Sequence, residues 1–138
     1  MTILVAILSL AAAGLASQPA LEAEAERFAE AWSSSDTEFL TRVLAEGGIR
    51  LHLPGEDHVL IRPRQARAAL EGFLGRHGPG EALVTRASLA GGSTEKGFAE
   101  IRWTTSSPGL PDPVIFILFV GYSLENDRWT VTEIRVLF

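Results

Sequence analysis

The segment Pro113-Val-Ile-Phe-Ile-Leu-Phe-Val-Gly121-Tyr122 decides the fold, because it is the one run after residue 16 with apolar residues at both alternating sets of positions. In a β-strand these residues divide between the two faces. One face carries Val114, Phe116, Leu118 and Val120, and the other carries Ile115, Ile117 and Phe119. Both faces of such a strand need a covering layer.

A short apolar run is also compatible with a buried helix, because periodicity alone does not separate the two structures. A strand is favoured because the run is rich in β-branched and aromatic residues and is bounded by Pro111, Pro113 and Gly121. A polar turn over 123–128 and a second β-rich segment over 129–138 follow. The pattern therefore predicts a C-terminal hairpin.

Covering the two faces matters for stability. Burial of one large apolar side chain contributes about 1.5–3 kcal/mol, whereas the whole free energy of unfolding of a domain is usually about 5–15 kcal/mol. We therefore expect helices of the same chain to cover one face of this strand and a second copy of the sheet to cover the other.

The chain has 138 residues, of which 46% are apolar, enough for one domain with one core. Residues 1–16 carry no charge, and the small residues Gly14 and Ala16 precede Ser17 as in a cleaved signal peptide. We interpret 1–16 as a signal peptide and 17–138 as a single exported domain, periplasmic or extracellular, that leaves the membrane once the signal is removed. A buried N-terminal helix is the alternative.

Composition narrows the classes of partner and chemistry. The chain has no cysteine, which excludes disulfides, thiolate metal sites and thiol nucleophiles. Its net charge is −5, and the twelve Lys and Arg residues are scattered. This distribution argues against nucleic acid or an anionic membrane as the main partner.

Three helices are predicted. The first starts at Pro19, and its apolar stripe consists of Leu21, Ala25, Phe28 and Trp32. A second follows the break at 33–36, with Ser35 and Glu38 spaced as a capping box, and ends at Gly47-Gly48. The third runs from Pro63 to His77, where the histidine suits a helix C-terminus.

Strands fill the rest of the chain. Residues 49–53 alternate between apolar and polar, Pro54-Gly55 forms a turn, and 58–61 return. Segments 81–90 and 98–105 precede the segment that decides the fold, and the second of them places Ala99, Ile101 and Trp103 on one face. The predicted order is two helices, a strand pair, a helix and four strands.

This order, together with Phe28-Ala-Glu-Ala-Trp32, the corner Ser35-Asp36 and the hairpin ending in 129–136, resembles the nuclear transport factor 2-like superfamily. Within it the chain is most similar to a branch of short exported bacterial domains. The resemblance implies an α+β, cone-shaped fold in which three N-terminal helices pack in a strongly curved antiparallel sheet.

The resemblance also implies a pocket at the open end of the cone and dimers formed through the opposite face of the sheet. Aromatic residues would line such a pocket for a small apolar ligand, or would simply form the core. They are Phe28, Trp32, Phe73, Trp103 and Tyr122. Candidates for the homodimer interface are Phe116, Ile117 and Phe119.

Enzymes of this superfamily use a pocket carboxylate as base beside a Tyr or His donor. No Asp of this chain lies inside a predicted strand, so the remaining candidates are Glu100 and Glu133, with Tyr122 as donor. The simpler interpretation is that these glutamates form cross-strand ion pairs. We therefore expect a non-enzymatic domain that binds a small apolar ligand or a protein; the alternative is an isomerase- or dehydratase-like enzyme with a strand glutamate as base.

One cluster contains side chains of the types that ligate metals. His52, Glu56, Asp57 and His58 occur within seven residues, but Pro54-Gly55 places them at a hairpin tip, where side chains do not converge as a metal requires. We expect an exposed polar hairpin and neither metal nor cofactor.

Overall fold

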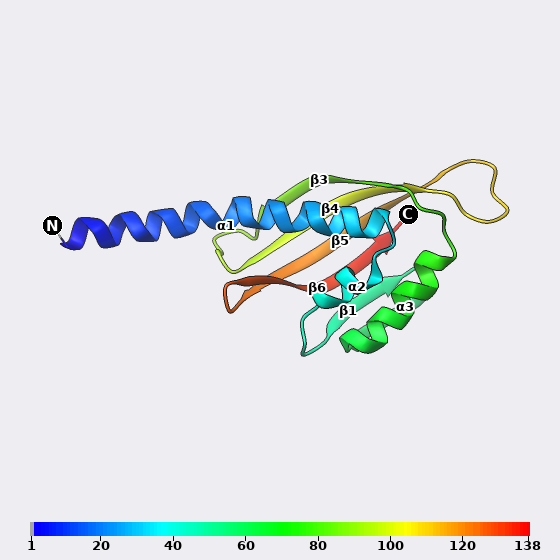
Figure 1. Cartoon of the computed structure of the whole chain (residues 1–138), viewed down its shortest axis with the longest axis horizontal. Helices are drawn as coiled ribbons and strands as arrows, with labels where there is room; N and C mark the ends of the chain where they lie inside the picture. The colour runs from blue at the N-terminus through cyan, green and yellow to red at the C-terminus, as the bar shows by residue number, and fades with distance from the viewer. Residues whose placement is uncertain (1) are drawn as a thin grey trace.

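The computed structural model describes the backbone of residues 2–138 and the side chains of residues 17–138. The helices are α1 (Thr2–Ser33), α2 (Thr37–Arg42) and α3 (Pro63–Gly75), and the strands are β1 (Ile49–Leu53), β2 (Glu56–Ile61), β3 (Glu81–Leu89), β4 (Lys96–Thr105), β5 (Val114–Glu125) and β6 (Arg128–Leu137) (Figure 1). The side chains of the predicted signal peptide lie outside the described residues, so export stays a prediction. No helix in the described part of the chain is long and apolar enough to cross a membrane.

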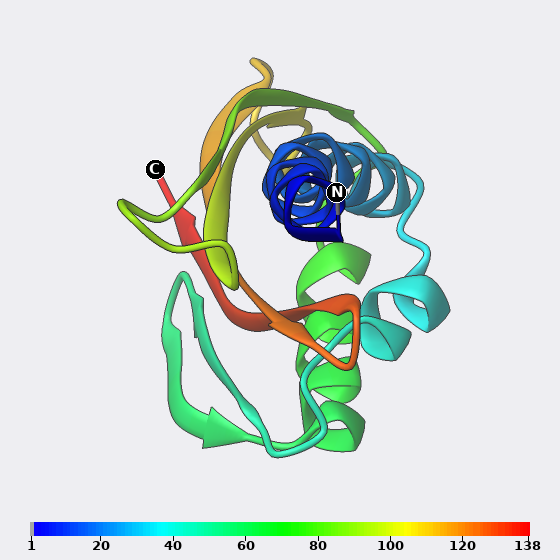
Figure 2. The same cartoon turned by 90° about the vertical axis from the view of Figure 1, so that its left-hand side faces the viewer.

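The six strands form one curved sheet in the order β2-β1-β6-β5-β4-β3, and Figure 2 shows this sheet bending around α1 and α3. The α+β, cone-shaped fold predicted from the sequence is confirmed. One detail differs, because β1 pairs with β6 in parallel while the other pairs are antiparallel. No tight turn joins β1 to β6, so nothing forces an antiparallel direction on this pair.

β5 is a strand near the centre of the sheet with two apolar faces, as predicted. Phe116, Leu118 and Val120 are buried under the helices, whereas Ile115 and Ile117 are 43% and 38% exposed on the outer face. The prediction that Phe116 lies at a dimer interface is wrong, because its parity directs the side chain into the core. Ile117 and Phe119 remain available on the outer face.

All four residues of the apolar stripe of the first helix are buried, as predicted, but α1 begins at Thr2 and not at Pro19, which lies inside the helix. The start of the second helix also differs from its prediction. Asp36, not Ser35, caps α2, accepting a hydrogen bond from the Phe39 backbone N–H at 3.1 Å. Ser35 has a φ of 57°, a left-handed conformation that turns the chain between the helices.

α2 also ends earlier than predicted. The helix stops at Arg42 because the chain beyond it pairs with β6: the Ala45 N–H donates to Val131 O, and the Val131 N–H donates to Val43 O, both at 2.8 Å. Hydrogen bonds to the sheet thus replace those of a continued helix.

Candidate functional site

The interior of the cone is filled by aromatic side chains. Trp32 meets Trp103 edge to face with ring centroids 5.6 Å apart, and Phe28 stacks on Trp32 at 5.9 Å. Phe73 contacts Trp103 and Phe116, each at 5.9 Å. These five residues are buried. The predicted ligand-binding aromatics Phe28, Trp32, Phe73 and Trp103 therefore pack against one another as core.

Tyr122 lies on the same inner face of β5 and is also buried. Its hydroxyl has no hydrogen-bond partner among the described residues, and neither have the indole N–H groups of Trp32 and Trp103. Burial, with a smaller contribution from the negative charge of Glu24, raises the pKa of the Tyr122 hydroxyl far above its usual range. Tyr122 therefore remains protonated at any physiological pH.

Glu100 and Glu133, the glutamates considered as general bases, lie on the outer face of the sheet. Glu100 stands opposite Phe119 in the register, and Glu133 stands opposite Gly121 and 3.8 Å from Arg50 Nη1. Tyr122 points to the inner face, so the three candidate catalytic residues do not meet. Neither glutamate therefore has Tyr122 beside it as the donor that the resemblance implies for a general base.

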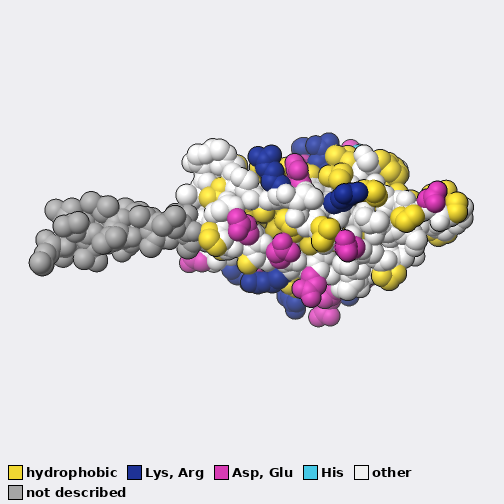
Figure 3. Space-filling model, turned by 90° about the horizontal axis from the view of Figure 1, so that it is seen from above, with side chains coloured by type: hydrophobic (Ala, Val, Ile, Leu, Met, Phe, Trp, Pro, Cys, Tyr) yellow, Lys and Arg dark blue, Asp and Glu magenta, His cyan; other side chains and the backbone are white. Residues whose placement is uncertain are grey.

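The outer face also carries an apolar strip. Phe98 stacks on Phe119 with ring centroids 5.6 Å apart, and the Arg86 guanidinium lies 5.1 Å from the centre of the Phe98 ring. Ile115 and Ile117 continue the strip along β5. Figure 3 shows a different side of the molecule, seen from above Figure 1. In that view acidic, basic and hydrophobic side chains are interspersed, and no basic stripe crosses the described part of the surface.

His77 closes one end of the aromatic core just beyond α3. Its ring lies 4.8 Å from Phe73 and 5.3 Å from Phe116, and its Nδ1 is 2.8 Å from Ser107 Oγ. Loss of hydration lowers the pKa of His77, an effect to which the positive charge of Arg76 adds and which a hydrogen bond with the Ser106 backbone opposes. The neutral ring is thus the form that the fold accommodates.

His77 should make stability depend on pH. Its pKa is lower in the folded chain than in the unfolded chain, so the unfolded chain takes up the proton first as pH falls below about 6.5. The free energy of unfolding should therefore decline between that pH and the lower folded pKa. Urea unfolding from pH 8 to pH 5 should show a steeper decline for the native chain than for His77→Gln. Equal slopes would contradict the burial of this ring.

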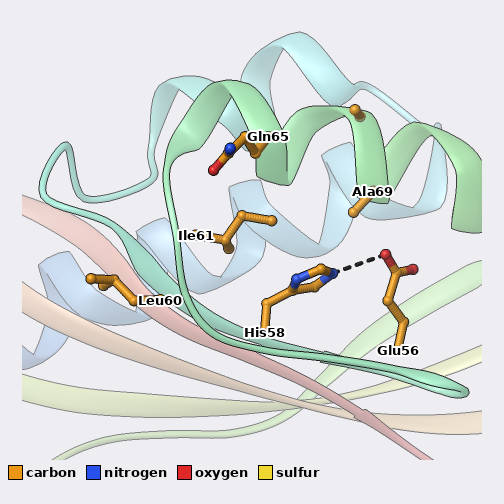
Figure 4. A pocket seen from close by; sticks show the side chains of 7 residues that line it. Glu56, His58, Leu60, Ile61, Gln65 and Ala69 are labelled. Atoms are coloured by element: carbon orange, nitrogen blue, oxygen red, sulfur yellow. Dashed lines mark hydrogen bonds and ion pairs between the residues drawn. The ribbon is translucent and has the colours of Figure 1, made fainter.

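A groove of about 520 Å³ lies between β2 and α3 (Figure 4). Glu56, His58 and Leu60 line it from β2, and Gln65, Ala68 and Ala69 line it from α3, with Ile61 at the end of the strand. β2 is an edge strand, so no further strand closes the groove. The small alanine side chains leave the space between strand and helix open.

Glu56 and His58 form a pair inside this groove. The His58 Nε2 atom lies 2.9 Å from Glu56 Oε1, and the two side chains are 33% and 41% exposed. In the neutral ring Nε2–H is the donor, which leaves Nδ1 as an acceptor. Asp57 points to the opposite face, where its carboxylate lies 3.5 Å from His52 Nδ1.

The cluster of His52, Glu56, Asp57 and His58 is therefore split into two pairs on opposite faces of the β1–β2 hairpin. Within residues 17–138 no three His, Asp or Glu side chains converge as metal ligands would. The sequence contained a signal for the groove that the hairpin interpretation missed, because Glu56 and His58 have the same parity and face the small residues of α3.

Comparisons with known proteins support the fold. No family model and no curated protein matches the sequence. Among solved structures, a DUF4783 family protein from Bacteroides uniformis superposes with a TM-score of 0.68 at 16% identity, covering 80% of this chain and 93% of its own. This chain has the nuclear transport factor 2-like fold.

Two further neighbours with this fold are named for enzyme-like relatives. A scytalone dehydratase-type protein from Novosphingobium aromaticivorans gives a TM-score of 0.72 at 10% identity over 91% of this chain and 86% of its own. A ketosteroid isomerase-like protein from Catenulispora acidiphila, solved in complex with trimethylamine, gives 0.63 at 14% identity over 80% and 81%. At such identities the likeness extends to the fold and not to the chemistry.

Proposed function

We propose that this chain is a non-catalytic binding domain that forms a homodimer through the outer face of its sheet. The observation that carries the proposal is the outer face of β5, where Ile115 and Ile117 are exposed and Phe119 is half-buried against Phe98. An apolar strip of this kind on a soluble domain marks an interaction surface. In this proposal the domain is exported after removal of residues 1–16.

The charges beside the strip favour a second copy as the partner. Glu100, Phe119 and Arg135 stand in one row across β4, β5 and β6. A two-fold axis parallel to β5 places Glu100 of each copy over Arg135 of the other and Phe119 over its own counterpart. Stacked sheets lie about 10 Å apart, a gap that glutamate and arginine side chains bridge together.

Binding without catalysis is favoured over the isomerase- or dehydratase-like alternative. The structure separates Tyr122 from Glu100 and Glu133 by the thickness of the sheet, and the aromatic core occupies the interior where a substrate would sit. The names of the two enzyme-like neighbours therefore support the fold of this chain and no reaction.

Exchange of the two charges tests the proposed dimer. Glu100→Arg alone sets like charges against each other at both symmetric contacts, as does Arg135→Glu alone, and each should weaken the dimer at least about tenfold. The double variant restores opposite charges and should recover most of the affinity. Sedimentation velocity gives the dissociation constant of the dimer for each of the three variants.

Glu26→Arg, at an exposed position on α1, is the matched control and should leave the dimer unchanged. The proposal is wrong if the loss of dimerisation free energy in the double variant equals the sum of the losses in the two single variants. It is also wrong if the control weakens association as much as Glu100→Arg, since net charge alone would then explain the result.

A further inference from the structure

Another cavity lies between residues 20–27 of α1, the helix α2 and the turn that joins β5 to β6. Figure 2 shows this turn beside α2 and below α1. The cavity has a volume of about 390 Å³, and part of its wall is apolar, formed by Ala20, Ala23, Phe39, Val43 and Trp129. Three segments that are far apart in the sequence thus meet around one hollow with aromatic walls.

The charged side chains of this cavity are mostly arginines. Arg27 lines it from α1, Arg42 from α2 and Arg128 from the start of β6. Two carboxylates, Glu24 and Asp127, also line it, so three positive and two negative groups leave a net charge of +1. The whole chain carries a net charge of −5. A positively charged hollow in an acidic chain indicates an anionic ligand.

Two of the three guanidinium groups are free to bind a ligand. Glu24 Oε1 lies 2.9 Å from Arg27 Nη1, so these two charges are paired. Arg42 and Arg128 form no ion pair with any described residue. The Arg42 guanidinium lies 5.6 Å from the centre of the Phe39 ring, a contact that holds it at the cavity wall while its N–H groups can still donate.

We propose that this cavity binds a small carboxylate that carries an apolar body. The two carboxylate oxygens accept N–H groups from Arg42 and Arg128, and the apolar body lies against Ala23, Phe39 and Trp129. Arginine is the side chain whose donors best match a carboxylate, and the volume is within the range of small-molecule sites. This site goes beyond the proposed dimer, because it lies among the helices and not on the outer face of the sheet.

Charge decides the class of ligand. A cation would meet Arg42 and Arg128 unpaired, and a neutral hydroxyl accepts a weaker hydrogen bond from a guanidinium group than a carboxylate does. A phosphate monoester carries nearly two negative charges at neutral pH, more than the single net positive charge of the lining. A singly charged carboxylate therefore matches the cavity best.

Three probes with the same aromatic body separate the effect of charge from that of apolar contact. They are 3-phenylpropionate, 3-phenylpropan-1-ol and 3-phenylpropylammonium, each titrated into the full chain and followed through backbone amide NMR shifts. The propionate should bind at least about tenfold more tightly than the alcohol or the ammonium. Shifts should centre on residues 20–27, 39–43 and 127–129.

Variants test the named residues. Arg42→Gln and Arg128→Gln should each lower the affinity for the propionate about tenfold and leave the affinity for the alcohol unchanged. Arg76→Gln removes the same charge at an exposed position just beyond α3 and is the matched control, which should leave both affinities unchanged. Ala23→Phe, at an exposed position on α1, should fill the cavity and abolish binding of both probes.

Equal affinities for the three probes would overturn the proposal, as would shifts centred on other segments. An equal loss of affinity in Arg76→Gln would also overturn it, since net charge alone would then explain the binding. The result is separable from the dimer. A variant that is monomeric through a change on the outer face should still bind the propionate with native affinity.

Discussion

Replacing Trp103 with alanine should lower the free energy of unfolding by about 3–5 kcal/mol. The side chain is buried between Trp32, Phe73 and Phe116, with ring centroids 5.2–5.9 Å away, so its removal leaves a large cavity among rigid rings. Its indole N–H has no hydrogen-bond partner among the described residues, so the loss arises from packing alone. Urea unfolding followed by circular dichroism measures the change.

Phe138→Ala is the matched control for this prediction. Phe138 touches Phe116 at a centroid distance of 5.0 Å but is 84% exposed, and its truncation should cost less than about 1 kcal/mol. A comparably small loss for Trp103→Ala would mean that the interior is loosely filled. The inner aromatics would then be available as a ligand pocket, contrary to the structure.

Replacing Phe119 with aspartate should abolish the dimer while leaving the chain folded. Phe119 is at the centre of the outer row, so in the dimer it buries its ring against the partner, and a carboxylate there would be buried without a counter-charge. In the isolated chain the change removes the contact of Phe119 with Phe98 but leaves the new carboxylate at the water-facing side of the sheet, so the monomer should be less stable and still folded. Light scattering after gel filtration gives the mass, and circular dichroism the fold.

Leu110→Asp introduces the same charge at an exposed apolar position in the loop between β4 and β5 and should leave the dimer intact. If Phe119→Asp unfolds the chain, the outer face is part of the core. If it stays dimeric, association uses another surface. Either outcome contradicts the proposed interface.

Much of the fold could be predicted from alternation alone. The two apolar parities of 114–120 predict a strand covered on its inner face, and Phe116 and Leu118 are buried there. The stripe from Leu21 to Trp32 likewise predicts the buried face of α1. Such patterns succeed because burial of large side chains dominates the choice of face.

The features that sequence reasoning missed depend on contacts between distant segments. α2 ends at Arg42 because Val43 and Ala45 hydrogen-bond to Val131, almost ninety residues away, and local helix signals do not contain that information. Ser35 looks like a cap by spacing, yet the turn between the helices assigns that role to Asp36. The parallel direction of β1 beside β6 is likewise a property of the assembled sheet.

The candidate site shows the same limit. The sequence predicts an exposed hairpin for Glu56 and His58, and they do lie in the β1–β2 hairpin, but both are half-buried. They line a groove that exists only because α3 returns across the inner face of β2. The alternation of the sequence predicts that Phe116 and Phe119 face opposite sides of the sheet. It does not predict that Glu100, Phe119 and Arg135 stand in one row, because that alignment depends on the register of three strands.

Sedimentation equilibrium of the full chain measures most directly whether the bare side of β5 is covered by a second molecule. The predicted result is a species of twice the 14.9 kDa chain mass that dissociates on dilution. A single species of 14.9 kDa at every concentration up to the solubility limit would contradict it.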